Sequence, residues 1–264
     1  MLPDYLQKFN ITLSSFQKKF PLDKWTDEFR ISLINDYSFF SVRLEDSKLQ
    51  YGDTIRFLNN ETIRSANLNS LLGVSEHQKT LLNLIENISA FEITEECIKS
   101  IHKTLMNSEF SWDGEFKNEL VGKYRNFPTK GSRAPFFEDK IYAPHYNLEM
   151  IMSSYVDIFK SRFEDINNQL PDKHLLTRIS YFHNRFLNEI HPFADGNGRV
   201  CRIIIGVVLM KNNCPPIFPK ILETENQLEY ISTIIECEKS NDDIPLIEFL
   251  AKGMTEYMLE KINS

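Results

Sequence analysis

The polar stretch at residues 191–202 reads HPFADGNGRVCR and lies between two apolar segments. Residues 172–190 carry their apolar side chains on one stripe, which predicts an amphipathic helix. Residues 199–211 are apolar on nearly every side, which is typical of a helix buried at the centre of a domain. The stretch therefore predicts two helices joined by a short polar loop, and a mainly α fold built around the second helix.

Each polar residue of this loop has a chemical interpretation. His191 follows the apolar stripe directly, and an imidazole held there can take up a proton near neutral pH. Asp195 is a carboxylate that could hold Mg²⁺ together with phosphate groups. Gly196, Asn197 and Gly198 open the second helix, where main-chain N–H groups form an anion site. Taken one by one, however, a histidine that ends a helix and an Asp-Gly-Asn turn are most often structural.

Arg199 and Arg202 lie three residues apart on the first turns of the second helix. Cations at a helix N-terminus oppose the helix dipole and cost about 0.3–1 kcal/mol each. Two arginines beside a glycine-rich turn are therefore expected where an anion such as a polyphosphate binds. A base, a metal-binding carboxylate, an anion site and two cations within twelve residues are hard to explain by turn formation alone.

The stretch at 191–202 resembles the defining motif of the Fic family, HPFx(D/E)GN(G/K)RxxR, at every specified position. Similarity extends over roughly residues 75–250 and includes GKYRN at 122–126, the sequence IYAPHY and the late stretch DDIPLIEFL. The resemblance implies a helical bundle with a small β-hairpin flap beside the active site. This agrees with the composition, because few residues are Gly (9) or Pro (11), which disfavours a turn-rich β fold.

The resemblance also implies a protein adenylyltransferase, which moves AMP from ATP onto a Ser, Thr or Tyr hydroxyl of a target protein. His191 would deprotonate the hydroxyl, Asp195 would hold Mg²⁺ (or Mn²⁺), and Phe193 would pack inward and anchor the loop. The implied nucleotide-binding residues are Phe193, Gly196, Asn197, Gly198, Arg199, Arg202 and Tyr230, with Arg202 on the γ-phosphate. Tyr230 has the alternative of a helix-packing residue, since Ile231 and Glu238 depart from the family pattern at the adenine side.

Gly198 narrows the reaction, because the branch of the family that phosphorylates its targets carries Lys at this position. An inhibitory helix is expected at about residues 31–47, where Ser41 and Glu45 match (S/T)xxxE(G/N) although Asp46 replaces Gly or Asn. Glu45 would pair with Arg202 in place of the γ-phosphate. The alternatives are an exposed helix on which Glu45 pairs only locally, and a chance match, because SxxxE is a frequent pattern.

The flap is expected at about residues 134–146, where PFFEDKIYAP predicts a hairpin that turns at Glu138-Asp139. Main-chain pairing with the flap would hold the target segment, and Lys140 and Tyr142 are candidate contacts to target or nucleotide. Surface solvation is the alternative role of both. Further helices are predicted at 54–72 and 75–90, separated by Gly73, and at 94–106, 147–165, 223–238 and 244–262. An N-terminal region is expected at 1–73 and a Fic domain at 74–264.

Charge and composition limit the partners. The net charge of −7 gives no overall field for nucleic acid, and the longest strongly apolar stretch is too short to cross a membrane. We expect a cytoplasmic protein, with export by a specialised system left open. Its expected partners are ATP and a target protein, which could be the chain itself, and assembly into a homo-oligomer is left open. Two other functions stay open: removal of AMP from a modified protein, and a catalytically silent interaction module.

Overall fold

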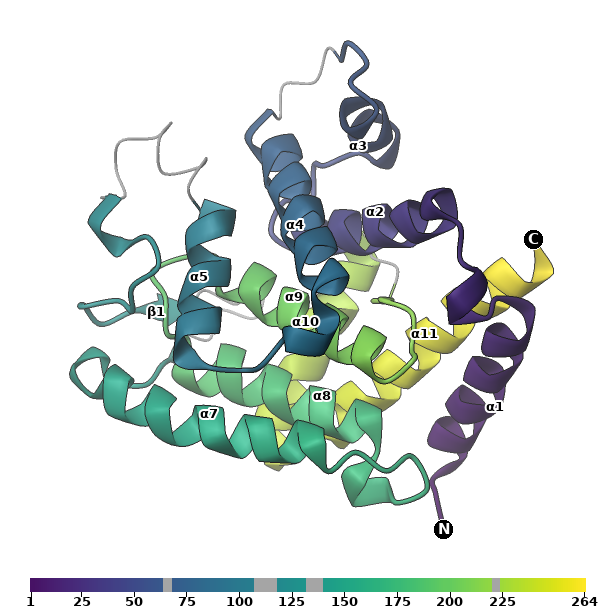
Figure 1. Cartoon of the computed structure of the whole chain (residues 1–264). Coiled ribbons are helices and arrows are strands. Elements are labelled where there is room, and N and C mark those ends of the chain that lie inside the picture. The colour runs from purple at the N-terminus through teal and green to yellow at the C-terminus, as the bar shows by residue number, and fades with distance from the viewer. Residues whose placement is uncertain (64–67, 107–117, 132–139, 220–223) are drawn as a thin grey trace.

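A computed structural model describes every residue of the chain except 64–67, 107–117, 132–139 and 220–223. The described part is mainly helical, as the sequence predicts, and Figure 1 shows helices packed around α9 (Asn197–Lys211). The other helices of more than one turn are α1 (Asp4–Lys19), α2 (Asp27–Arg43), α3 (Tyr51–Leu58), α4 (Leu68–Glu86), α5 (Glu95–Met106), α7 (Leu148–Glu164), α8 (Leu175–Asn184), α10 (Thr224–Ser240) and α11 (Ile244–Asn263).

Helix α9 is buried on all sides, which confirms the prediction of a central helix. Its apolar residues pack against α2, α4, α5 and α8, which surround it. Tyr37 of α2 crosses directly over Gly206, where an added Cβ would lie 3.0 Å from the tyrosine ring. Close contact between α2 and α9 matters for the site, because it places the end of α2 beside the first turns of α9.

The predicted helix at 172–190 consists of two parts. Its regular part, α8, begins after His174, whose side chain caps the helix by accepting a hydrogen bond from the Leu176 N–H at 3.1 Å. From Arg185 to Ile190 the chain continues as η6, a segment of π-helix. Such segments are rare and are found mostly at functional sites. The polar loop at 191–196 begins where η6 ends.

Two helix predictions for the N-terminal half are wrong. Gly73 does not separate two helices, because α4 runs through it. The burial of Leu71 and Val74 outweighs the cost of about 1 kcal/mol for a glycine within a helix. The predicted helix at 54–72 is not continuous, because α3 ends at Leu58 and α4 begins at Leu68, with residues 64–67 outside the described residues. The division into a region at 1–73 and a domain at 74–264 stays a prediction.

The β-hairpin is present, and its second strand lies within the predicted KIYAP sequence. β1 (Lys130–Gly131) pairs in antiparallel fashion with β2 (Lys140–Ile141), in a register that places Gly131 opposite Lys140. The PFF sequence, which we expected in the first strand, lies outside the described residues. Gly131 is suited to this position because an added Cβ would lie 2.2 Å from the Tyr142 hydroxyl. The expected turn at 138–139 lies outside the described residues.

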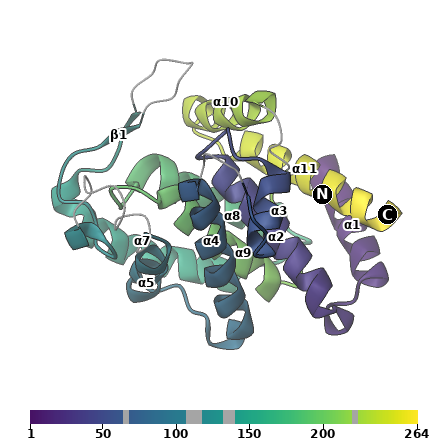
Figure 2. The ribbon, with the colours of Figure 1, turned by 90° about the horizontal axis from the view of Figure 1, so that it is seen from above.

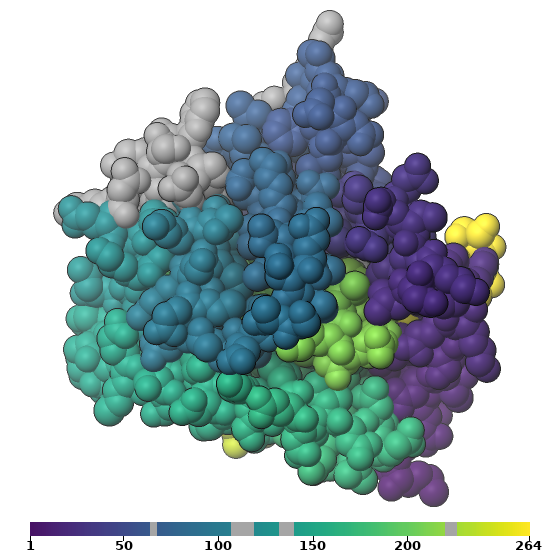
Figure 3. All heavy atoms as spheres, viewed as in Figure 1, coloured from purple at the N-terminus to yellow at the C-terminus, as the bar shows by residue number. Residues whose placement is uncertain are grey.

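The two terminal helices pack together, with α1 against α11 on the side away from the hairpin (Figures 1 and 2). The space-filling view shows the light-green residues at the end of α9 reaching the surface between the blue α4 region and the purple N-terminal region (Figure 3). Among the described residues, no helix combines the length and the apolar character needed to cross a membrane.

Candidate active site

His191 lies directly after η6 in a left-handed backbone conformation, with φ of 49°. Its N–H donates to the Phe186 carbonyl at 2.9 Å, a bond that ends the π-helical segment. Its Nδ1 lies 2.9 Å from the Leu187 carbonyl oxygen. Because a carbonyl only accepts, Nδ1 carries the proton and Nε2 is left as a proton acceptor. The helix end thus holds the ring in the tautomer that a general base requires.

Arg125 holds the main chain around His191. Its buried guanidinium donates to the carbonyls of His191 (2.8 Å), Ala143 (2.5 Å), Phe127 (3.0 Å) and Ile190 (3.3 Å). A cation at the C-terminal end of a helix is favoured by the helix dipole. Arg125 therefore stabilises the left-handed turn at His191 and links it to Ala143, which follows the hairpin.

The hairpin covers one face of the histidine. The ring of Tyr142 stacks on the imidazole of His191, with ring centres 4.0 Å apart and an angle of 15° between the planes. Two residues earlier, Lys140 forms an ion pair with Glu238 of α10. Of the two predicted flap residues, Tyr142 thus contacts the candidate base, whereas Lys140 links the hairpin to α10.

Burial and the charge of Arg125 lower the pKa of His191 below its ordinary value, against the opposing effect of its bond to Leu187.

The loop after His191 is closed by Asn197. Its side-chain Oδ1 accepts from the Phe193 N–H at 2.8 Å, and its Nδ2 donates to the Phe193 carbonyl at 2.9 Å. The Asn197 side chain therefore shapes the loop. The main-chain N–H groups remain as the donors of the predicted anion site. The Phe193 side chain has no exposed surface. Phe193 thus packs inward at the loop, and its contact with a nucleotide stays a prediction.

Asp195 has the features of a carboxylate that shares a metal ion with a ligand. Its side chain is 55% exposed, its Oδ1 accepts from the Gly196 N–H, and its Oδ2 lies 3.5 Å from Arg199. Within the described ranges, no cluster of three or more His, Cys, Asp or Glu side chains could hold a metal ion. Mg²⁺ is commonly held by one or two carboxylates with phosphates and water, so this single exposed carboxylate fits that ion.

Arg202 is buried in the first turns of α9 and bonds to the end of α2. Its Nε donates to the Ser41 hydroxyl and its Nη2 to the Ser41 carbonyl, both at 2.9 Å. The same Nη2 lies 2.5 Å from the Glu45 carboxylate. The structure thus contains the ion pair that the sequence pattern predicts, and it brings Ser41, Glu45 and Arg202 together.

Glu45 itself lies just beyond α2, not within it. The helix ends at Arg43, and the Glu45 N–H donates to the Val42 carbonyl in the following turn. Asp46, which departs from the family pattern, bonds to the Ser70 hydroxyl of α4 at 2.5 Å and to the Lys48 N–H. The aspartate therefore has a structural role, because it fastens the turn that carries Glu45 to α4.

Gly198 lies beneath this ion pair. A Cβ at this position would be 2.2 Å from the Glu45 carboxylate and under 3.0 Å from the Arg202 guanidinium. The absence of a side chain is therefore what allows Glu45 to approach Arg202. At Gly196 the backbone has φ of 73°, and an added Cβ would be 2.7 Å from the Met106 sulfur, so glycine is required there for two reasons.

Tyr230 occupies the interior. Its side chain is 8% exposed, packs against Phe218 and Phe249, and places its hydroxyl 2.6 Å from His183. This contact corresponds to the helix-packing alternative for Tyr230. Its hydroxyl also interacts with Arg202, so the buried arginine has a partner on α10 in addition to those at the end of α2.

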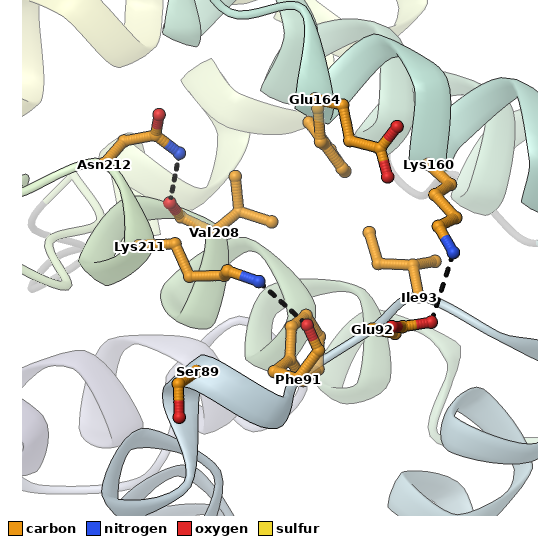
Figure 4. A pocket seen from close by; sticks show the side chains of 10 residues that line it. Ser89, Phe91, Glu92, Ile93, Lys160, Glu164, Val208, Lys211 and Asn212 are labelled. Carbon is orange, nitrogen blue, oxygen red and sulfur yellow. Dashed lines mark hydrogen bonds and ion pairs between the residues drawn. The ribbon is translucent and has the colours of Figure 1, made fainter.

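A cavity lies at the other end of α9, beside Lys211 and Asn212 (Figure 4). Its volume is about 350 Å³, and α7 and the segment before α5 complete its walls. Lys211 donates to the Phe91 carbonyl at 2.8 Å, and Lys160 pairs with Glu92 at 3.1 Å. The two lysines of this cavity are thus satisfied by their immediate neighbours.

Sequence reasoning did not assign roles to Arg125 or His102. Arg125 belongs to the GKYRN sequence. A basic residue within an irregular segment could have indicated a side chain that donates hydrogen bonds to main-chain carbonyls. His102 lies on the apolar face of α5, where a histidine is easily taken for a core residue. Neither signal is strong without the fold, because both side chains act on residues far along the chain.

Comparisons with known proteins support the resemblance of this chain to the Fic family. Residues 92–209 match the model of the Fic/DOC family. A curated relative, "Protein adenylyltransferase Fic" of Nematostella vectensis, is 26% identical over 189 residues, which cover 70% of this chain and 37% of the relative. This chain therefore spans little more than a third of that protein.

Solved structures agree on the fold. A Fic domain containing signaling protein from Bacteroides thetaiotaomicron is similar over 97% of this chain and 96% of its own, with a TM-score of 0.75 and 22% identity. A Fic family protein from Desulfovibrio desulfuricans covers the whole chain and 75% of its own, with a TM-score of 0.74 and 16% identity. The hairpin, the polar loop and α9 are thus parts of a known Fic architecture.

Proposed function

We propose that this chain is a protein adenylyltransferase that transfers AMP from ATP to a Ser, Thr or Tyr hydroxyl of a target protein. The observation that carries the proposal is the orientation of His191, whose Nδ1–H is held by the Leu187 carbonyl so that Nε2 faces the reaction as a base. The name of the Nematostella relative supports the same reaction.

In this reaction His191 Nε2 takes the proton of the target hydroxyl, and the hydroxyl oxygen attacks the α-phosphorus of ATP. The bond between that phosphorus and the oxygen that bridges to the β-phosphate breaks, and pyrophosphate leaves. The main-chain N–H groups of Gly196 and Gly198, together with Arg199, would stabilise the charge on the phosphates. Arg202 would bind the γ-phosphate once Glu45 has left it.

The half-exposed Asp195 carboxylate would hold Mg²⁺, for which Mn²⁺ could substitute. The ion, when bound, neutralises phosphate charge and orients the leaving group. Gly198 supports nucleotide transfer over phosphoryl transfer, because the branch of the Fic family that phosphorylates its targets carries Lys at this position.

Glu45 acts as an internal inhibitor in this proposal. Its carboxylate occupies the cation that would bind the γ-phosphate, and Ser41 holds the same guanidinium from the end of α2. ATP would therefore bind in an unproductive position until this contact breaks. The carboxylate side chain is 45% exposed, so it can leave the arginine without disrupting the core.

The target would bind at the hairpin through main-chain pairing with its strands. Tyr142 covers the His191 ring on this side, so a hydroxyl side chain of a docked segment would reach Nε2 past its edge. The target could be this chain itself. Lys140 has a structural role in addition, because it connects the hairpin to Glu238.

Removal of AMP from a modified protein is a second candidate. The specific observation is that the charge of Glu45 acts on His191 and raises its pKa against the effect of burial. A carboxylate within electrostatic reach of the base could orient a water molecule toward a phosphodiester. Incubation of an AMP-modified target with Mg²⁺ and the wild-type protein distinguishes the two, because only the second reaction releases AMP without pyrophosphate.

The test of the main proposal is intact mass spectrometry after incubation with ATP and Mg²⁺. Glu45→Gly should gain one AMP per chain or label added candidate targets, wild type should do so weakly, and His191→Ala should not. Equal labelling of wild type and Glu45→Gly would contradict the inhibitory role and leave the enzyme. The absence of adducts on the chain and on every candidate target would contradict adenylyl transfer.

A further inference from the structure

Helix α5 brings a buried histidine against the polar loop from outside the 191–202 stretch. His102 is 1% exposed and lies 93 residues before the loop residue that it contacts. Its ring contacts the loop and the segment at Gly122. Elementary hydrogen-bond chemistry assigns the donor and the acceptor in both of its hydrogen bonds.

The two ring nitrogens of His102 have different partners. The Gly122 N–H donates to Nδ1 at 2.9 Å, and Nε2 lies 3.1 Å from the Asp195 carbonyl oxygen. A main-chain N–H only donates and a carbonyl only accepts. Nδ1 must therefore be bare and Nε2 must carry the proton. This tautomer is the reverse of that at His191, where Nδ1 is the donor.

The His102 ring also packs against the side chains and backbone of the loop. Phe193 stacks on the imidazole with ring centres 4.0 Å apart and planes 7° apart. At Gly196, a Cβ would lie 3.5 Å from the His102 ring and 2.7 Å from Met106, one turn further along α5. The loop therefore passes directly over α5, and His102 lies against it from Phe193 to Gly196.

The contacts of His102 anchor a part of the loop that its internal hydrogen bonds do not fix. The bonds between Phe193 and Asn197 close the loop internally, and Arg125 fixes its start at His191. The bond from His102 ties the main chain of Asp195 to α5. The residue thus anchored carries the exposed carboxylate that faces the phosphate site.

We propose that His102 is a positioning residue of this site, whose Nε2–H fixes the Asp195 main chain and thereby the direction of the Asp195 carboxylate. The proposal rests on the proposed function, because it assigns His102 to the binding of a nucleotide with a divalent cation. It predicts that His102 matters more for cation-dependent nucleotide binding than for nucleotide binding as such.

The experiment measures ATP affinity by calorimetry in the Glu45→Gly background, with Mg²⁺ and with a chelator in its place. His102→Phe keeps an aromatic ring against Phe193 but loses both polar contacts. Affinity with Mg²⁺ should fall about tenfold or more, as is usual for groups that orient metal ligands, while affinity in the chelator should stay unchanged. Wild-type-like affinity with Mg²⁺, or an equal loss in both conditions, would overturn the proposal.

Two amide variants separate the two nitrogens and keep the test informative if His102→Phe folds poorly. The amide nitrogen of His102→Gln reaches the position of Nε2 and should restore most of the Mg²⁺-dependent affinity. His102→Asn reaches only the position of Nδ1 and should not. Restoration by Asn and not by Gln would contradict the role of the bond to Asp195.

His174 offers a matched control, because it is also buried and bonded through both nitrogens, to Asn10 and to the Leu176 N–H. His174→Gln should leave the difference between the two titrations unchanged. If the parent Glu45→Gly protein binds no ATP in either condition, the proposed function fails. If the parent binds and His102→Phe matches it, only the positioning role fails.

The tautomer gives a readout that needs no nucleotide. Nitrogen NMR of the labelled protein should show His102 with a bare Nδ1 and a protonated Nε2. The opposite tautomer would contradict the donated bond to Asp195 whatever the outcome of the binding experiments.

Discussion

The two ends of α9 both carry cations, and they satisfy them in opposite ways. At the C-terminal end, Lys211 agrees with the helix dipole and bonds to the nearby Phe91 carbonyl. At the N-terminal end, Arg199 and Arg202 oppose the dipole and are buried, and Arg202 is held by Glu45 from another segment. A cation that opposes its own helix is expected to serve a ligand, and its protein partner is expected to be replaceable.

The largest expected effect is the difference in AMP transfer between neutral substitutions of Arg202 and of Lys211, one at each end of α9. Arg202→Gln should lower AMP transfer by about a hundredfold or more, since it removes a charged donor from the phosphate site. Lys211→Gln should leave the rate unchanged, because Lys211 lies at the other end of the helix. The assay compares initial labelling rates in the Glu45→Gly background. Equal losses in both variants would mean that the two ends do not differ in function.

The second prediction concerns acid, because buried neutral histidines surround the N-terminal end. Burial lowers the pKa of His183 to about 3, and the charge of Arg202 acts in the same direction. His183 faces Arg202 of α9 and Tyr230 of α10. The unfolded chain takes up this proton near pH 6.5 and the folded chain does not, so stability falls as pH falls below about 6.5, by about 1.4 kcal/mol per pH unit.

Urea unfolding at pH 7, 6 and 5 measures this effect. In His183→Gln the dependence on pH should become shallower by up to one proton, although the variant is less stable at pH 7. An unchanged slope would mean that His183 is charged in the folded protein.

The third prediction uses Gly198. An added methyl group would collide with the Glu45 carboxylate, so Gly198→Ala should weaken the ion pair at Arg202. We expect the destabilisation to be smaller by about 1 kcal/mol when Glu45 is already Gly, since contacting residues couple by about this amount. Urea unfolding of the four proteins of the double-mutant cycle measures it. Additive effects would show that the two residues do not share the space.

The smallest expected effect is at Asp46. Asp46→Ala removes the bonds to Ser70 and Lys48 and should cost about 1 kcal/mol in unfolding free energy. The turn that carries Glu45 would loosen, so AMP transfer should rise modestly over wild type. Ser70→Ala is the matched variant from the other side of one bond and should act in the same direction. A rise in stability or a fall in rate would contradict this role.

The sequence predicted the central helix and the Arg202–Glu45 contact on different grounds. The uniform apolar character of α9 indicates its burial, whereas the pairing of Glu45 with Arg202 was implied by the resemblance to the Fic family. The tertiary partners of Arg125 and His102 could not be predicted in this way, because their acceptors are main-chain carbonyls, which leave no trace in the sequence. The prediction of a helix break at Gly73 was wrong because the packing of α4 outweighs the low helix propensity of glycine.

Arg125 connects the hairpin to the histidine. Its guanidinium joins the carbonyl of Ala143, next to the hairpin, to the carbonyls of Ile190 and His191. A displacement of the hairpin would therefore displace the His191 imidazole as well. If the proposed function holds, selectivity between target proteins would depend on turnover as much as on affinity, because a poorly seated target would be bound and yet left unmodified.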